Sequence, residues 1–101
     1  MRPIEKRLDK LASQLCRLKY SGSCYLCGRP GSDTHHIVSR NHKRQRWNPD
    51  NLVFLCRPCH IKAHAENMTF DRYLDQSVKI WHISELKDLE KELKLKINTY
   101  K

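Results

Sequence analysis

The chain lacks any apolar run long enough to cross a membrane, and its charged N-terminus lacks the apolar stretch of a secretory signal. We therefore expect a protein of a reducing cytoplasm with no membrane contact. In that compartment, paired cysteines bind metal ions more often than they form disulfides. The sequence also lacks internal repeats and low-complexity segments. Its length predicts a single domain over residues 1–101.

Acidic residues are few. Eleven Asp and Glu stand against twenty Lys and Arg, so the formal net charge is +9. That balance favours a polyanionic partner, and nucleic acid is the simplest one. A chain of 101 residues buries only a thin core, so a bound metal ion or a partner would add stability.

Apolar residues recur at steps of three and four near both ends of the chain, which predicts an amphipathic helix at each end. We expect helical arms at residues 3–18 and 69–100 around a core at residues 24–66. The second arm is predicted to hold a short helix and a long one, capped by Thr69 and Ser84 respectively. The short helix would contain Phe70, Tyr73 and Leu74, and the long one carries the apolar stripe Leu86, Leu89, Leu93 and Ile97.

Four cysteines form two Cys-x-x-Cys pairs, namely Cys24, Cys27, Cys56 and Cys59. Zinc prefers four tetrahedral ligands, and each pair presents two sulfurs from one tight turn. We predict that the four sulfurs bind one structural Zn²⁺. An alternative is a local site of the second pair with His60 and His64, but His60 follows Cys59 directly and the two cannot easily reach one ion. Cys16 lies outside the pattern and is predicted to be buried.

Four histidines and one asparagine remain beside these cysteines. The adjacent His35 and His36 lie in a β-branched stretch, residues 34–38, which is typical of a short strand. Neighbouring side chains on a strand point to opposite faces, so one histidine can bind a metal ion while the other acts as a general base. His60 and His64 are four residues apart on a predicted helix and can hold the same cation. A second predicted strand, residues 52–55, follows Asn51.

This pattern resembles the HNH nuclease family. The resemblance is carried by Cys24-x-x-Cys27, His35-His36-Ile37, Asn51-Leu52-Val53, Cys56-x-x-Cys59-His60 and His64. It implies an α+β fold, in which a small, treble-clef-like ββα-metal module is stapled by a four-cysteine zinc ion. Helices at the N-terminus and the C-terminus would flank that module.

The resemblance also implies an activity, the metal-dependent hydrolysis of DNA to a 5′-phosphate and a 3′-hydroxyl. His36 would be the general base that activates water, and Asn51 would orient the base and its loop. His35, His60 and His64 would bind the catalytic cation, which stabilises the leaving 3′ oxygen. Many relatives have Asp where this chain has His35. Imidazoles suit Zn²⁺, Ni²⁺ or Mn²⁺ better than Mg²⁺, and the choice among these four ions stays open.

A basic run follows the histidine strand. Its cations are predicted to contact the DNA backbone, although a solvated loop is the alternative. They are Arg40, Lys43, Arg44 and Arg46. Trp47 is predicted to lie in the core beneath this loop, and His42 and His82 are predicted to lie on the surface. The stretch 46–51 also resembles phage recombination endonucleases, which implies branched DNA as substrate and a bacterial or phage-encoded protein.

Two functions from other classes remain open. The chain could be a zinc-stabilised module that binds nucleic acid without cutting it. It could also be a subunit of a larger phage or restriction complex that docks through the apolar stripe of the final helix. As an enzyme it is expected to be a monomer or a homodimer. The number of metal ions per chain and a requirement for divalent cations would separate these functions.

Overall fold

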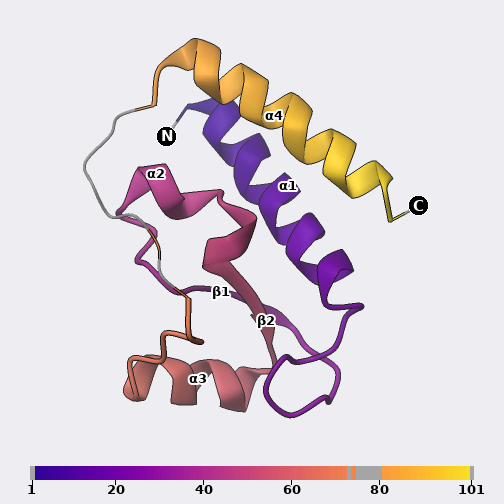
Figure 1. The fold of residues 1–101 in the computed structure, drawn as a ribbon, viewed down its shortest axis with the longest axis vertical. Helices are drawn as coiled ribbons and strands as arrows, with labels where there is room; N and C mark the ends of the chain where they lie inside the picture. Colours follow the sequence, from indigo (N-terminus) through magenta and orange to yellow (C-terminus); the bar gives the residue numbers. More distant parts are fainter. Residues whose placement is uncertain (1, 73, 75–80, 101) are drawn as a thin grey trace.

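Two long helices lie on one side of a two-stranded sheet, and a nine-residue helix lies on the other side. The computed structural model describes residues 2–72, 74 and 81–100. In chain order its elements are α1 (Pro3–Lys19), β1 (Asp33–His36), α2 (Lys43–Arg46), the 3₁₀ turn η1 (Pro49–Asn51), β2 (Leu52–Leu55), α3 (Arg57–Ala65) and α4 (Ile83–Asn98). Figure 1 shows α1 and α4 side by side, running in the same general direction, with α3 at the other end of the molecule. The predicted α+β fold is confirmed.

Strand β2 separates two hydrophobic clusters, and every residue in it is buried. Leu52 and Phe54 pack in the larger cluster with α1 and α4. Val53 and Leu55 pack in the smaller cluster with Ala63 of α3. Side chains along a strand alternate between the two faces of the sheet, so β2 contributes to both clusters. A fully apolar strand is therefore what this fold requires at residues 52–55.

Strand β1 pairs antiparallel with β2, and the register decides where the two adjacent histidines point. His35 lies opposite Val53, and His36 lies opposite Leu52. Directly opposed residues of an antiparallel pair share one face of the sheet. His35 is therefore on the α3 face and His36 is on the α1 face, as the sequence predicted for neighbours on a strand.

Helices α1 and α4 bury their apolar faces against each other. From α1 the buried residues include Ile4, Leu8, Ala12 and Leu15, and from α4 they are Leu86, Leu93 and Ile97. Cys16 is buried in the same cluster, as predicted. Because α1 covers the α4 stripe, that stripe is not available to dock the chain onto a larger complex.

The second helical arm is shorter than the sequence predicted. The predicted short helix fails at Phe70 and Asp71, because both have φ of +56°, a left-handed conformation that ends a right-handed helix. Tyr73 lies outside the described residues. The final helix begins at Ile83 with His82, rather than Ser84, at its N-cap. Among the described residues, the predicted arm at 69–100 is helical only over Ile83–Asn98.

The basic run is not the open loop that the sequence predicted. It contains the short helix α2, and Trp47 at its end is buried in the larger cluster, as predicted. His42 and His82 are exposed, also as predicted. None of the helices within the described residues has both the length and the apolar character needed to span a membrane.

Candidate active site

Four cysteine sulfurs meet beside the first turn of α3. Cys24 and Cys27 come from the turn that follows α1, whereas Cys56 precedes α3 and Cys59 lies in its first turn. The sulfurs lie within 4.8 Å of one another, and those of Cys27 and Cys56 are 3.6 Å apart. In a zinc tetrahedron with bonds of about 2.3 Å, sulfurs are about 3.8 Å apart. The cluster fits a structural zinc ion, and the alternative Cys₂His₂ site is wrong, because the histidines belong to a separate cluster.

The pKa values of the thiols in this cluster move in opposite directions. Burial raises the pKa of Cys24, but hydrogen bonds from the backbone amides of Cys56 and Cys27 outweigh it and lower the pKa to about 6. The pKa of Cys59 rises to about 12, and the largest cause is its hydrogen bond with Cys56. The thiols therefore cannot all ionise unaided, and a bound cation would remove that conflict.

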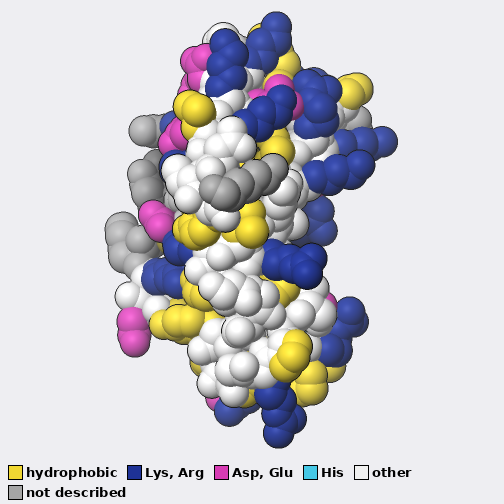
Figure 2. Space-filling view, turned by 90° about the vertical axis from the view of Figure 1, so that its right-hand side faces the viewer, with side chains coloured by type: hydrophobic (Ala, Val, Ile, Leu, Met, Phe, Trp, Pro, Cys, Tyr) yellow, Lys and Arg dark blue, Asp and Glu magenta, His cyan; other side chains and the backbone are white. Residues whose placement is uncertain are grey.

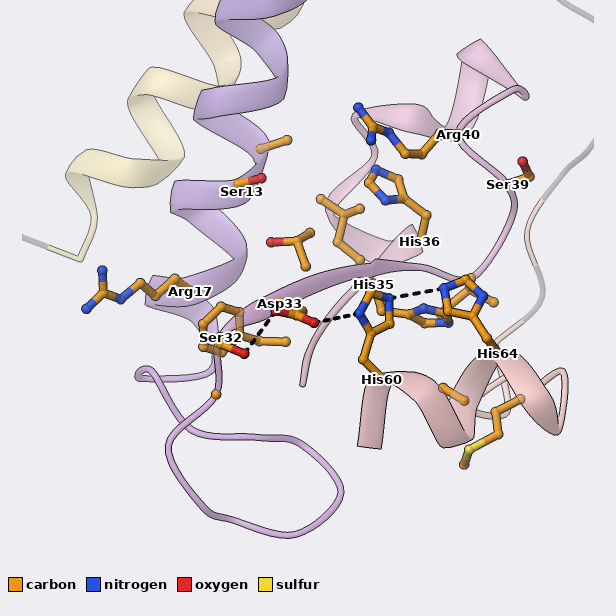
Figure 3. A pocket seen from close by; sticks show the side chains of 18 of the residues that line it. Ser13, Arg17, Ser32, Asp33, His35, His36, Ser39, Arg40, His60 and His64 are labelled. Carbon is orange, nitrogen blue, oxygen red and sulfur yellow. Dashed lines mark hydrogen bonds and ion pairs between the residues drawn. The ribbon is translucent and has the colours of Figure 1, made fainter. Parts of the chain in front are cut away.

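Three imidazoles form the second cluster, where β1 and α3 meet. His35 comes from β1, and His60 and His64 come from α3 (Figure 3). One ligand atom from each lies within 4.8 Å of the others. The Nε2 atoms of His60 and His64 are 3.1 Å apart, which brings two nitrogens toward a common point.

The hydrogen bond between His60 and Asp33 turns the lone pair of His60 toward the centre of this cluster. The carboxylate of Asp33 accepts from Nδ1 of His60 at 2.8 Å, so the lone pair of His60 is on Nε2, toward His64. In the described part of the chain, Nδ1 of His35 is buried without a hydrogen-bond partner. Burial lowers the pKa of His35 to about 4, so its ring is neutral at neutral pH. A buried, unpartnered imidazole nitrogen fits a metal ligand.

His36 reaches the same cleft from the other face of the sheet. The cleft has a volume of about 1360 Å³ and is lined by residues of α1, β1 and α3, including both His35 and His36. Because β1 is one edge of the two-stranded sheet, side chains from both of its faces can reach a cleft along that edge. Figure 3 shows His36 beside Arg40, on the opposite side of β1 from His60 and His64.

The ring of His36 is held in one protonation state. Its Nε2 lies 3.1 Å from the carbonyl oxygen of Arg46. A carbonyl oxygen can only accept, so Nε2–H donates and the lone pair is on Nδ1. Burial, followed by the positive charge of Arg40, lowers the pKa of His36 to about 4. The imidazole is therefore neutral at neutral pH and can accept a proton.

Asn51 is fully buried and holds the backbone that follows β1. Its Oδ1 accepts from the amide of Val38 at 2.6 Å, and its Nδ2 donates to the carbonyls of Val38 and Gln45. Its own carbonyl accepts from the amide of Ile37 at 2.9 Å. Among the described residues, the side chain of Asn51 forms no hydrogen bond with a histidine. Its place in the site is to fix the chain on either side of His36, which makes it a positioning residue.

The comparison with protein families agrees with this geometry. The family model described as HNH endonuclease matches residues 24–66. These residues are an HNH domain. The match begins at the first zinc-cluster cysteine and ends just beyond α3, so it includes both clusters. A search of curated proteins found no match, and a search of solved structures found none either.

Replacing Asn51 with alanine should destabilise the HNH domain by about 3 kcal/mol, because it removes three buried hydrogen bonds between this side chain and the backbone of Val38 and Gln45. Urea unfolding followed by circular dichroism measures this loss. Asn48→Ala is the matched control: its side chain is partly exposed and, among the described residues, bonds only the side chain of Gln45 and the amide of Asp50. We expect a loss below about 1 kcal/mol for the control. Equal losses in the two variants would show that Asn51 is an ordinary turn residue.

The predicted DNA-contacting cations of the HNH domain all have carboxylate partners. Asp9 of α1 binds Arg46 at 2.8 Å and lies 3.7 Å from Arg40, and it also accepts from Nε1 of Trp47. The other two cations pair with the ends of the long helices: Lys43 with Glu5 at 3.3 Å, and Arg44 with Glu85 at 2.9 Å. These bonds attach the basic segment to α1 and α4. The contact of these cations with DNA stays a prediction.

Sequence reasoning missed several residues around the cleft. Asp33 is two positions before His35 on the same strand, so period-two spacing already placed it on the metal-facing side. Ser13 and Arg17 of α1 also line the cleft, although they lie outside the matched HNH segment. In the sequence, these two residues belong to a stripe of polar residues at helical spacing. Nothing local in the sequence showed that this stripe would face the histidines.

Proposed function

We propose that this protein is a metal-dependent endonuclease that hydrolyses phosphodiester bonds in DNA. The single observation that carries the proposal is the convergence of His35, His60 and His64 in a cleft that His36 also lines. A closed structural zinc site requires none of these four imidazoles. Hydrolysis of a phosphodiester requires a base, a cation and a cleft that holds both beside the phosphate.

His36 is the general base of the proposed reaction. Its neutral imidazole takes a proton from a water molecule, whose oxygen forms a bond to phosphorus while the bond from phosphorus to the 3′ oxygen breaks. The products are a 5′-phosphate and a 3′-hydroxyl. The bond from Nε2 to the Arg46 carbonyl keeps the ring fixed, with the Nδ1 lone pair free to receive the proton. Asn51 fixes the backbone around this ring.

His35, His60 and His64 would hold the catalytic divalent cation. When bound, such an ion supplies positive charge that stabilises the phosphate oxygens and the leaving 3′ oxygen. Three imidazole ligands favour Mn²⁺, Ni²⁺ or Zn²⁺ over Mg²⁺. Asp33 holds His60 in the tautomer and orientation that a ligand needs, which is the usual part of a carboxylate beside a metal-binding histidine.

Arginines on the walls of the cleft would receive the DNA. Arg17, Arg40 and Arg57 all line it, and each side chain is exposed enough to meet a phosphate. Guanidinium groups bind phosphate oxygens without reading the bases, so we expect little sequence preference. A phage role in recombination, with branched DNA as substrate, is part of the proposal and rests on the resemblance of residues 46–51.

The experiment is a nicking assay with supercoiled plasmid and with linear, nicked and branched duplexes, over a series of divalent cations. We expect no cleavage without an added cation, and two metal ions per chain in the active protein. The Asp33→Asn variant should need about 10- to 100-fold more cation for half-maximal cleavage, because it loosens His60. Arg57→Gln, which removes the guanidinium partner of Asp33, should leave that requirement within about threefold.

The assay also decides between the enzyme and a module that only binds nucleic acid. One zinc ion per chain, with DNA binding but no cleavage under any of the cations, would favour the binding module. If Asp33→Asn needs no more cation than the native chain, Asp33 does not support the metal site, and the proposed activity still stands.

A further inference from the structure

Three cations on the exposed face of α1 have no ion-pair partner within residues 2–72, 74 and 81–100. They are Lys6, Lys10 and Arg17, and all three are exposed. With Ser13 they recur at steps of four, three and four residues, which places them on one stripe of the helix. This face points away from the buried face of α1 that packs against α4. We call these four residues the α1 stripe.

The α1 stripe differs in charge balance from the basic segment of the HNH domain. Each cation of that segment has a carboxylate within 4.0 Å, as described above. A phosphate that approached them would have to compete with these carboxylates. No acidic side chain in the described part of the chain forms an ion pair with the α1 stripe, and the chain as a whole has a formal net charge of +9. On the face in Figure 2, Lys and Arg side chains outnumber Asp and Glu, and among the described residues no histidine is visible.

The position of the α1 stripe connects it to the cleft. Ser13 and Arg17 line the same cleft as the three metal-facing histidines. Figure 3 shows these two residues on α1, across the cleft from His60 and His64 on α3. Lys10 and Lys6 continue the stripe away from the cleft along the same helix. From Lys6 to Arg17 the stripe is about 16 Å long, which matches about five base pairs of duplex along its axis.

We propose that the α1 stripe is a phosphate-binding track that holds the DNA strand leading into the histidine cleft. Lys6, Lys10 and Arg17 supply charge to successive phosphates, and the Ser13 hydroxyl donates to a phosphate oxygen between them. The contacts are independent of base sequence. This proposal takes its partner, DNA, from the proposed function and adds a contact surface outside the matched residues 24–66.

The test is the affinity for a short fluorescent duplex, measured by anisotropy at several salt concentrations. Zinc-loaded His36→Ala protein serves as the parent, so that cleavage during the measurement is about 10²- to 10⁴-fold slower. Adding Lys6→Gln, Lys10→Gln and Arg17→Gln should weaken binding on the order of 100-fold at about 0.1 M salt. The slope of log affinity against log salt should fall in magnitude by about 2.7, since about three counterion-releasing contacts are lost.

A matched control removes the same charge elsewhere. Arg29→Gln, Lys62→Gln and Lys96→Gln together also remove one arginine and two lysines. These residues lie off α1 and do not line the cleft. We expect the control to weaken binding by less than about fivefold, since a distant charge acts only through a screened field.

Three outcomes would overturn the track: unchanged affinity in the α1 variant, equal losses in the two triple variants, or no DNA binding by the parent. Nicking by the native chain is measured separately. If the native chain cuts DNA but the α1 substitutions leave the affinity unchanged, the proposed function stands and the phosphate-binding track is rejected. If the native chain does not cut DNA but binds it through the α1 stripe, the track stands and the proposed function is rejected.

Discussion

Replacing His36 with alanine should slow DNA cleavage about 10²- to 10⁴-fold, because the reaction loses the group that accepts the proton of the attacking water. The ring is neutral at neutral pH, and its free Nδ1 is available in the cleft. Its neighbour His35 faces α3 and cannot take over this function. The rate is measured by single-turnover nicking of plasmid at saturating cation. Added imidazole should restore part of the activity, because it can occupy the space left by the missing ring.

The matched control for this variant is His42→Ala. His42 is an exposed histidine in the segment that follows β1, and its ring makes no hydrogen bond among the described residues. We expect a rate within about twofold of the native rate, as for a surface substitution. His36→Ala should keep both metal ions and its melting temperature, which separates a lost base from a lost fold. An unchanged cleavage rate in His36→Ala would exclude His36 as the base.

The two clusters of candidate metal ligands could be predicted from sequence, because ligand chemistry depends on residue type and short spacing. A Cys-x-x-Cys turn presents two sulfurs wherever it occurs, and two such turns complete a tetrahedral site. The alternation of side chains on a strand similarly placed His35 and His36 on opposite faces before the register was known. Spacing also placed His60 and His64 together on one side of a helix.

The contacts between distant segments could not be predicted in this way. The bidentate bond of Asp9 to Arg46 joins residues 37 positions apart, and it decides that the basic segment lies against α1. No periodicity marks such a pair. The same holds for Arg17, whose place in the cleft depends on how α1 crosses the sheet. The sequence pattern therefore predicted which histidines and cysteines gather together, but it did not predict that α1 forms one wall of the cleft.

Local backbone geometry explains why the predicted short helix of the second arm is wrong. Thr69 and the apolar residues after it match a capped helix, but Phe70 and Asp71 adopt left-handed angles. Phe70 instead packs in the smaller cluster, with its ring 5.8 Å from that of His35. Burial of an aromatic ring beside the histidine cluster outweighs the propensity of a short, isolated helix.

Loss of the structural zinc should unfold α3 and abolish cleavage. This helix has nine residues, and Ala63 is its only buried side chain. Isolated helices of that length are unstable in water, so packing alone cannot hold α3 in place. Zinc would tie Cys56 and Cys59, at the start of α3, to Cys24 and Cys27. Binding of a structural zinc is worth about 10–16 kcal/mol in small zinc-finger peptides, which is comparable to the whole stability of a small domain.

The Cys24→Ser variant tests this. It should lose its zinc and its helical signal, and the amides of residues 57–65 should exchange hydrogen as fast as in an unfolded chain. Because α3 carries His60 and His64, the second metal ion should be lost with the first. Cys16→Ala is the matched control: it removes a thiol that is buried away from the zinc cluster, so it should keep one structural zinc and lose only about 1 kcal/mol. A zinc-free Cys24→Ser protein that still protects the α3 amides would mean that packing, rather than the metal, holds the histidines in place.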